Sequence, residues 1–129
     1  MPKVVLIVED SETCAETLLI AFESLSGIEP RIIASLGAAV AAIEQHSSEV
    51  AALVTDLHVG NGDQVHSDGF DLIRRLRADQ RFAKLPILLI SGDSDPRLPA
   101  RAIAQGANAF FAKPYSPAEV RKKLEQLIC

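Results

Sequence analysis

The chain has 129 residues, of which 48% are hydrophobic and 23% are charged, and its formal net charge is −4. This length suits one domain that buries its own core, and we expect residues 1–129 to form it. The negative charge argues against a nucleic-acid-binding surface. No apolar run approaches the roughly 20 residues that span a membrane. Cys14 and Cys129 lack metal-binding spacing, so we expect free thiols in a cytoplasmic protein.

Five short apolar segments alternate with longer amphipathic segments along the chain. The apolar segments are residues 3–8, 31–35, 50–55, 86–91 and 108–112. They are almost continuously apolar, which is typical of parallel strands that are buried on both faces of a sheet. The sequence therefore predicts five parallel strands.

The amphipathic segments predict five helices. Four of them cover residues 11–25, 36–46, 68–78 and 98–105, and the fifth begins after Ser116. Ser116, Pro117 and Glu119 have the pattern of an N-cap, a first helical residue and a capping-box partner. Strand and helix alternate five times, so right-handed connections predict a doubly wound α/β fold with helices on both faces of the sheet. Basic runs at 74–77 and 121–123 are interpreted as solvated helix faces.

Polar residues stand at the carboxyl ends of the predicted strands, where sheets of this kind bind ligands. Glu9 and Asp10 follow the first strand, and Asp56 follows the third. Ser91 ends the fourth strand, and Lys113 follows the fifth. Three carboxylates at one edge of a sheet repel one another unless a cation lies between them. All-oxygen ligands favour Mg²⁺, with the hydroxyl and the ammonium group facing a phosphoryl group.

Taken in order, these segments resemble the response-regulator receiver domain, the phosphoacceptor module of two-component signalling. The matching segments are VED (8–10), LVTD (53–56), DGFDLIRRLR (68–77), ISG (90–92) and AIAQGANAFFAKP (102–114). The resemblance covers essentially the whole chain. It implies a flavodoxin-like fold and a signalling module rather than an enzyme. It also implies a sensor histidine kinase or phosphotransfer protein as phosphodonor.

The resemblance implies a role for each of the acidic residues. Asp56 would accept the phosphoryl group from a histidine of the donor protein. Asp10 and Asp56 would bind Mg²⁺ directly, while Glu9 would act through a water molecule. The backbone carbonyl of His58 would be a further metal ligand.

The resemblance also implies a switch. Ser91 and Lys113 would hold the phosphoryl oxygens, and Phe110 occupies the position of the family's aromatic switch. When Ser91 moves onto the phosphoryl group, the ring of Phe110 would turn inward. This change would reach a downstream protein through the surface formed by the helix at 98–105, the strand at 108–112 and the last helix.

The loop after Asp56 departs from the family pattern. Gly60 stands where relatives usually have a proline, and Asp68-Gly69 comes several residues later than in relatives. The loop is rich in Gly, Asn and Asp. We therefore expect an enlarged and mobile loop at residues 57–67.

Two further hypotheses concern the histidines of this loop. His58 and Asp93 stand two residues after the acceptor and after Ser91, at positions that flank the phosphoryl group in the family. We hypothesise that they tune the lifetime of the phosphoryl group. His58, Asp63, His66 and Asp68 could instead form a transition-metal site, although a polar loop is the simpler interpretation.

Simpler interpretations also exist for the strand-end residues. Asp10 could serve only as a helix N-cap, Asp56 could be a turn residue, and Phe110 could be ordinary core. Glu9 would have no role under the first of these. The presence of polar residues at four strand ends together favours a common site.

Three other functions compete with the phosphoacceptor. A Mg²⁺-dependent phosphatase of the haloacid-dehalogenase kind also uses a strand-end aspartate nucleophile. Those enzymes place a second acid where His58 stands and close the site with an inserted cap, which this chain lacks. A receiver-like binding module that is never phosphorylated would not need the complete set of site residues. A dinucleotide-binding protein is disfavoured because VEDSET replaces the glycine-rich turn after the first strand.

Overall fold

A five-stranded parallel sheet lies at the centre of the computed structural model, which describes residues 3–58 and 68–128. The strands are β1 (Lys3–Val8), β2 (Ile28–Ile33), β3 (Val50–Asp56), β4 (Ile87–Ser91) and β5 (Ala109–Ala112). Their spatial order is β2-β1-β3-β4-β5, and every neighbouring pair is parallel. This topology confirms the predicted doubly wound, flavodoxin-like fold.

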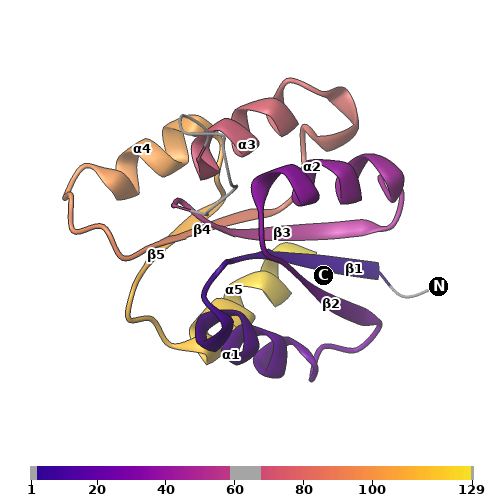
Figure 1. Ribbon diagram of the computed structural model, residues 1–129, viewed down its shortest axis with the longest axis horizontal. Helices are drawn as coiled ribbons and strands as arrows, with labels where there is room; N and C mark the ends of the chain where they lie inside the picture. Colours follow the sequence, from indigo (N-terminus) through magenta and orange to yellow (C-terminus); the bar gives the residue numbers. More distant parts are fainter. Residues whose placement is uncertain (1–2, 59–67, 129) are drawn as a thin grey trace.

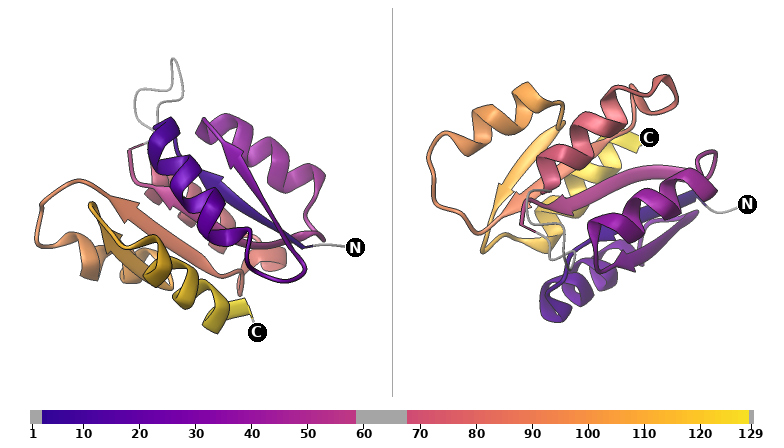
Figure 2. Two further views of the ribbon diagram at one scale, coloured as in Figure 1. Left: turned by 90° about the horizontal axis from the view of Figure 1, so that it is seen from below. Right: turned by 45° about the horizontal axis from the view of Figure 1, so that its top comes forward.

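Helices cover both faces of the sheet (Figure 1). One face carries α2 (Leu36–Gln45), α3 (Gly69–Arg77) and α4 (Leu98–Gln105), and the other carries α1 (Glu12–Phe22) and α5 (Pro117–Ile128). The two layers are seen from further directions in Figure 2. A short 3-10 helix, η1 (Gln80–Phe82), follows α3 and was not predicted. None of the helices in the described ranges is long and apolar enough to cross a membrane.

The apolar run of β1 is explained by burial on both sides. Val4, Leu6 and Val8 belong to the hydrophobic cluster that also contains residues of α2, α3 and α4. Val5 and Ile7 belong to the second cluster, with residues of α1 and α5. Because successive side chains of a strand point to opposite faces, a strand between two helical layers needs apolar residues at every position.

The bounds of β2 and α1 differ most from the prediction, since β2 covers Ile28–Ile33 rather than 31–35 and α1 covers Glu12–Phe22 rather than 11–25. β2 begins at Ile28 and continues through Pro30 to Ile33, which an edge strand allows because it pairs on one side only. The N-cap of α1 is Ser11, whose side chain accepts a hydrogen bond from the backbone of the first turn. The simpler interpretation of Asp10 as a helix cap is therefore wrong.

Side-chain caps fix the starts of α3 and α5. The Asp68 side chain accepts a hydrogen bond from the backbone N–H of Asp71, and the Asp71 side chain accepts one from the backbone N–H of Asp68. This reciprocal pair is a capping box, which satisfies backbone donors that have no partner inside the helix. At α5, the backbone N–H of Glu119 donates to Ser116 Oγ at 3.4 Å, so Ser116 accepts as expected of the predicted cap.

Candidate functional site

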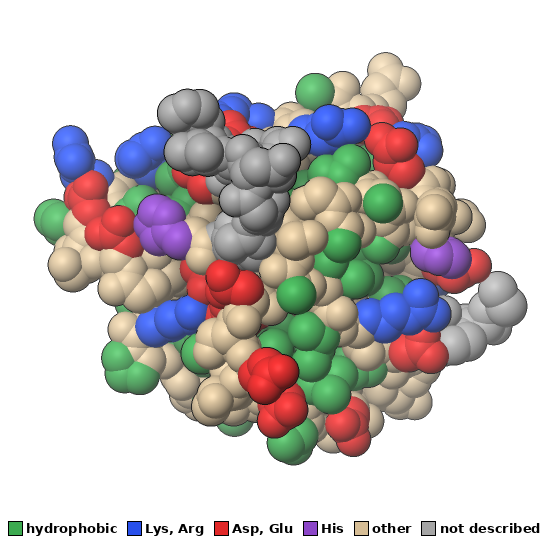
Figure 3. All heavy atoms as spheres, viewed as in Figure 1, with side chains coloured by type: hydrophobic (Ala, Val, Ile, Leu, Met, Phe, Trp, Pro, Cys, Tyr) green, Lys and Arg blue, Asp and Glu red, His purple; other side chains and the backbone are tan. Residues whose placement is uncertain are grey.

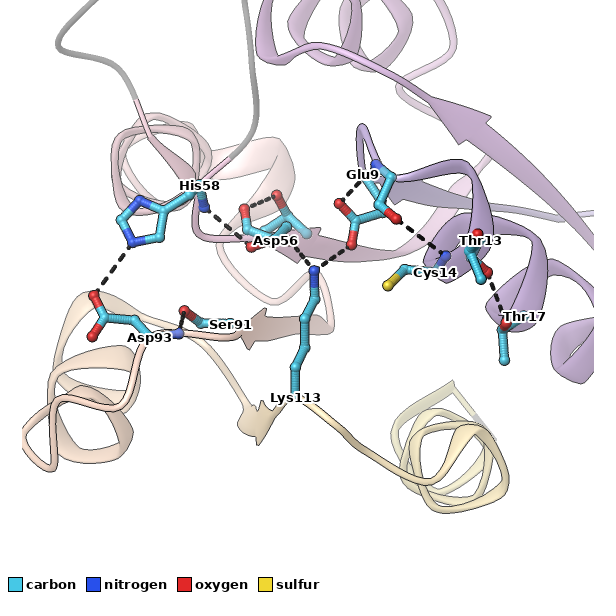
Figure 4. Close-up of polar contacts among 11 residues, drawn as sticks. Glu9, Thr13, Cys14, Thr17, Asp56, His58, Ser91, Asp93 and Lys113 are labelled. Carbon is cyan, nitrogen blue, oxygen red and sulfur yellow. Dashed lines mark hydrogen bonds and ion pairs between the residues drawn. The ribbon is translucent and has the colours of Figure 1, made fainter.

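The carboxyl ends of β1, β3 and β5 bring three charged side chains together (Figure 4). Lys113 Nζ lies 2.7 Å from Glu9 Oε1 and 2.5 Å from Asp56 Oδ2. Glu9 is 1% exposed and Asp56 is 5% exposed. The ammonium group therefore offsets the repulsion between two carboxylates that are withdrawn from water.

Backbone hydrogen bonds between strands hold the residues of this site. Leu57 N donates to Ile90 O at 2.9 Å, and Lys113 N donates to Ser91 O at 2.8 Å. Asp56 itself pairs with Ile90 in the register of β3 and β4. Asp56 and Lys113 therefore extend from the ends of paired strands rather than from free loops, which limits their movement.

Glu9 is buried in an electrostatically costly position. Its Oε2 accepts a hydrogen bond from Ser11 N at 3.3 Å. Burial raises the pKa of Glu9, the hydrogen bond from Lys113 lowers it, and the charge of Asp56 raises it, so that the net shift is upward. Burial would lower the pKa of Lys113, but its hydrogen bonds to Asp56 and Glu9 outweigh this and raise the pKa. Lys113 therefore remains a cation at neutral pH.

The raised pKa of Glu9 gives stability a predictable pH dependence. Because the folded state holds the Glu9 proton more tightly than the unfolded state, this carboxyl costs stability as the pH rises from 4.5 through its folded-state pKa. We therefore compare the free energy of unfolding of the wild type with that of Glu9→Gln. The difference, wild type minus variant, should fall as the pH rises from 4.5 through the folded-state pKa of Glu9, and should then stay constant. Urea unfolding at a series of pH values measures the difference, with exposed Glu16→Gln as control. A difference that grows in favour of the wild type would contradict the shift.

Two loops place the remaining polar residues across the site from Glu9. The backbone N–H of His58 donates to Asp56 Oδ1 at 3.1 Å, and His58 Nε2 lies 3.5 Å from Asp93 Oδ2. The backbone N–H of Asp93 donates to the buried Ser91 Oγ at 3.0 Å. The loops after β3 and β4 are thus joined beside Asp56 (Figure 4). The metal-binding role of the His58 carbonyl stays a prediction.

Several other residues that the sequence singled out are less buried than Glu9 and Asp56, or lie outside the described residues. Asp10 is exposed. Phe110 is partly buried and packs against the hydrophobic cluster shared with α2, α3 and α4, so its role as a switch stays a prediction beside its role in packing. Asp63 and His66, which the alternative transition-metal site needs, lie outside the described residues, as does Cys129. Cys14 is a half-buried free thiol.

The carboxylates meet the chemical requirements of a hard divalent cation. In the described part of the chain, no three His, Cys, Asp or Glu side chains are grouped closely enough to hold a metal ion. Glu9 and Asp56 nevertheless supply adjacent carboxylate oxygens, and oxygen is the ligand that Mg²⁺ prefers. Burial and the charge of Asp56 both raise the pKa of Glu9. A cation beside Glu9 would offset the cost of burying its negative charge and would reduce its repulsion from Asp56. The donor set therefore fits Mg²⁺, whose binding stays a prediction.

Two residues near the site were not singled out from the sequence. The backbone N–H of Ser11 holds Glu9, and the sequence feature that could have identified Ser11 is a serine directly before an amphipathic run.

Tyr115 follows the cis peptide bond between Lys113 and Pro114, and its hydroxyl is buried with no hydrogen-bond partner in the described structure. Burial, followed by the charges of Cys14 and Glu9, raises its pKa to about 12. No spacing rule identifies such a hydroxyl.

Two arginines of the basic run at 74–77 have acidic or polar partners. Arg74 contacts Asp71 and Gln105, and Arg75 contacts Glu44. On the face seen in Figure 3, lysines and arginines are scattered among acidic side chains.

Arg77 is an exception to the predicted solvated face. It is partly buried and donates hydrogen bonds to the backbone carbonyls of Gly106 and Phe82 at 2.8 to 2.9 Å. It therefore links the end of α3 to the turn between α4 and β5. The side chain has a structural role that its position in a basic run did not reveal.

Comparison with known proteins identifies similar chains. The model of the response regulator receiver domain matches residues 5–125. Chemotaxis protein CheY1 of Helicobacter pylori J99 is 27% identical over 123 residues, which are 95% of this chain and 94% of that protein. Transcriptional regulatory protein GltR of Pseudomonas aeruginosa is 32% identical over 96% of this chain and 48% of its own length. A crystal structure from Chloroflexus aurantiacus, described as that of a response regulator, has 29% identity and a TM-score of 0.84, and covers 99% of this chain and 98% of that one.

Proposed function

Since the chain belongs to the response regulator receiver domain family, we propose that it accepts a phosphoryl group on Asp56 in a Mg²⁺-dependent reaction. The observation that carries the proposal is the contact of Lys113 Nζ with both Glu9 and Asp56 at the carboxyl edge of the sheet. A carboxylate nucleophile beside a fixed cation is suited to attack on a phosphoryl group, whose oxygens carry negative charge.

The side chains divide the reaction between them. An Asp56 carboxylate oxygen forms a bond to phosphorus while the bond between phosphorus and the donor's histidine nitrogen breaks. The backbone N–H of His58 holds Oδ1 and so fixes the rotation of the carboxylate. Lys113 transfers its contact from Asp56 to a phosphoryl oxygen, and the Ser91 hydroxyl donates to another. Mg²⁺, held by Asp10, Asp56 and the His58 carbonyl, would shield the negative charge that the carboxylates and the phosphoryl oxygens share.

The signalling role follows as part of the same proposal. A histidine kinase or a phosphotransfer protein would supply the phosphoryl group in the cytoplasm. Ser91 Oγ accepts a hydrogen bond from the backbone N–H of Asp93, and Ser91 would leave this position when it moves onto the phosphoryl group. Its departure would free space for the ring of Phe110. A downstream protein would detect the change on the surface of α4, β5 and α5.

Incubation with acetyl phosphate and Mg²⁺, followed by mass spectrometry of the intact protein, tests the proposal. The wild type should gain a phosphoryl group, and Asp56→Asn should gain none because a carboxamide is a poor nucleophile. Asp93→Asn removes a neighbouring carboxylate that is not the acceptor and should still be modified. Equal modification of Asp56→Asn would contradict the assignment. Steady turnover of the donor without an adduct would favour the phosphatase alternative.

The contact between His58 and Asp93 motivates a prediction about the lifetime of the adduct. The two side chains come from different loops and meet at 3.5 Å. At the positions that flank the phosphoryl group, they would restrict the approach of water to it. His58→Ala should therefore shorten the lifetime of the phosphoryl group, by about two- to ten-fold. Loss of label after removal of the donor measures the effect. His46→Ala, which removes a histidine at the end of α2, is the control. Equal half-lives for His58→Ala and the wild type would refute the hypothesis.

A further inference from the structure

Gly69, the first residue of α3, packs directly against the backbone of the phosphoacceptor. Its N–H donates to Leu57 O at 2.8 Å. A Cβ at this position would lie 2.7 Å from Asp56 O and 3.0 Å from Leu57 Cα, which is closer than non-bonded atoms pack. Resting on the proposed function of Asp56, we propose that Gly69 is a positioning residue that sets the orientation of Asp56 through this backbone contact.

The requirement for glycine here is one of space rather than of backbone conformation. The described glycines with positive φ are Gly27 and Gly106, so Gly69 does not need the left-handed region. The two nearest crowding atoms belong to the main chain and cannot rotate away, whereas the third, Leu89 Cδ1 at 3.2 Å, is the end of a side chain that can. The helix cannot retreat from this contact without breaking the hydrogen bond from Gly69 N to Leu57 O.

The crowded carbonyl belongs to the network that holds the nucleophile. Asp56 O accepts a hydrogen bond from Thr55 Oγ1 at 3.0 Å, and Leu57 N donates to Ile90 O at 2.9 Å. The next backbone N–H, of His58, holds Asp56 Oδ1. A side chain at position 69 would push the Asp56 carbonyl away, turn the following peptide and weaken that hydrogen bond. Misplacing a reacting group by about 1 Å can slow a reaction about a hundred-fold.

The same contact ties the start of α3 to the residue that follows Asp56. The hydrogen bond from Gly69 N to Leu57 O is the backbone link between them.

The chain offers a matched control at Gly37, the second residue of α2, where an added Cβ would meet nothing within 4 Å. Gly37→Ala, Gly69→Ala and the double variant are compared with the wild type. Amide resonances in ¹H–¹⁵N spectra, recorded without metal or donor, report the backbone geometry at Leu57 and His58. The rate of modification by acetyl phosphate at saturating Mg²⁺, corrected for the folded fraction, reports the reaction.

We expect Gly69→Ala and the double variant to shift the amide resonances of Leu57 and His58, and to lower the corrected rate about ten- to a hundred-fold. Gly37→Ala alone should change neither the amide resonances nor the corrected rate. Because alanine has a higher helix propensity than glycine, this substitution should also help the double variant to fold. A folded Gly69→Ala with wild-type resonances and rate would overturn the proposal. Loss of folding in both Gly69→Ala and the double variant would also overturn it, since Gly69 would then serve the fold alone. Absence of any adduct in the wild type contradicts the proposed function instead, while the amide shifts still test the contact.

Discussion

Lys113→Met is expected to lower the free energy of unfolding by about 3 kcal/mol at pH 7. Glu9 and Asp56 are buried, and Lys113 Nζ contacts both, so its removal leaves two carboxylates facing each other without a counter-charge. The lysine side chain is 24% exposed, which places the cost at the lower end of the range for broken buried ion pairs. Methionine keeps the apolar stem, so the loss reports charge rather than packing.

The same variant should acquire a stronger pH dependence. The hydrogen bond from Lys113 lowers the pKa of Glu9, so without it this pKa, already raised by burial, rises further. The folded variant then binds a proton that the unfolded chain releases, and its stability increases as the pH falls from 7 towards 5. Urea unfolding at both pH values measures this, with exposed Lys84→Met as the matched control. Equal stability of Lys113→Met and the wild type at pH 7 would contradict the role of the ammonium group.

Asp10→Asn should weaken Mg²⁺ binding more than Glu9→Gln does. Both carboxylate oxygens of Glu9 are buried and accept hydrogen bonds, from Lys113 Nζ and Ser11 N, and Asp10, the next residue along the chain, is exposed to solvent. Glu9 would therefore reach the metal through water, and the loss of such an outer ligand costs about 10- to 100-fold in affinity. The loss of a direct ligand at Asp10 should exceed this.

Calorimetric titration with Mg²⁺ at neutral pH measures both affinities, and Glu12→Gln at the start of α1 provides a control for loss of charge alone. Salt is held constant because surface charge is screened by ions. Equal losses for Asp10→Asn and Glu9→Gln would show that the two acids are ranked wrongly.

The fold was predictable because its signals are local and repeated. The unbroken apolar run in β1 indicated burial on both faces, and the packing of Val5 and Val4 into different clusters confirms it. The carboxyl-edge rule brought Glu9, Asp56 and Lys113 to one place, since each follows or ends a parallel strand. The edge position of β2 was not visible in the sequence, so Pro30 was excluded from a strand that includes it.

The contacts within the site could not be predicted from spacing. Convergence at one edge does not reveal that Lys113 bridges Glu9 and Asp56, because that depends on side-chain rotamers. The close approach of Gly69 to Asp56 depends on how α3 docks onto the sheet after the loop. Both are properties of packing between segments that are distant in sequence.

The identity of the modified residue tests the central claim most directly. Wild-type protein is treated with acetyl phosphate and Mg²⁺, and the acyl phosphate is trapped by borohydride, which reduces the modified carboxyl group to an alcohol. Peptide mass spectrometry then locates the reduced residue. The proposed mechanism predicts reduction at Asp56 alone, and only when both donor and Mg²⁺ are present. Reduction at Glu9 or Asp10, or an adduct that forms equally well after Mg²⁺ is chelated, would contradict it.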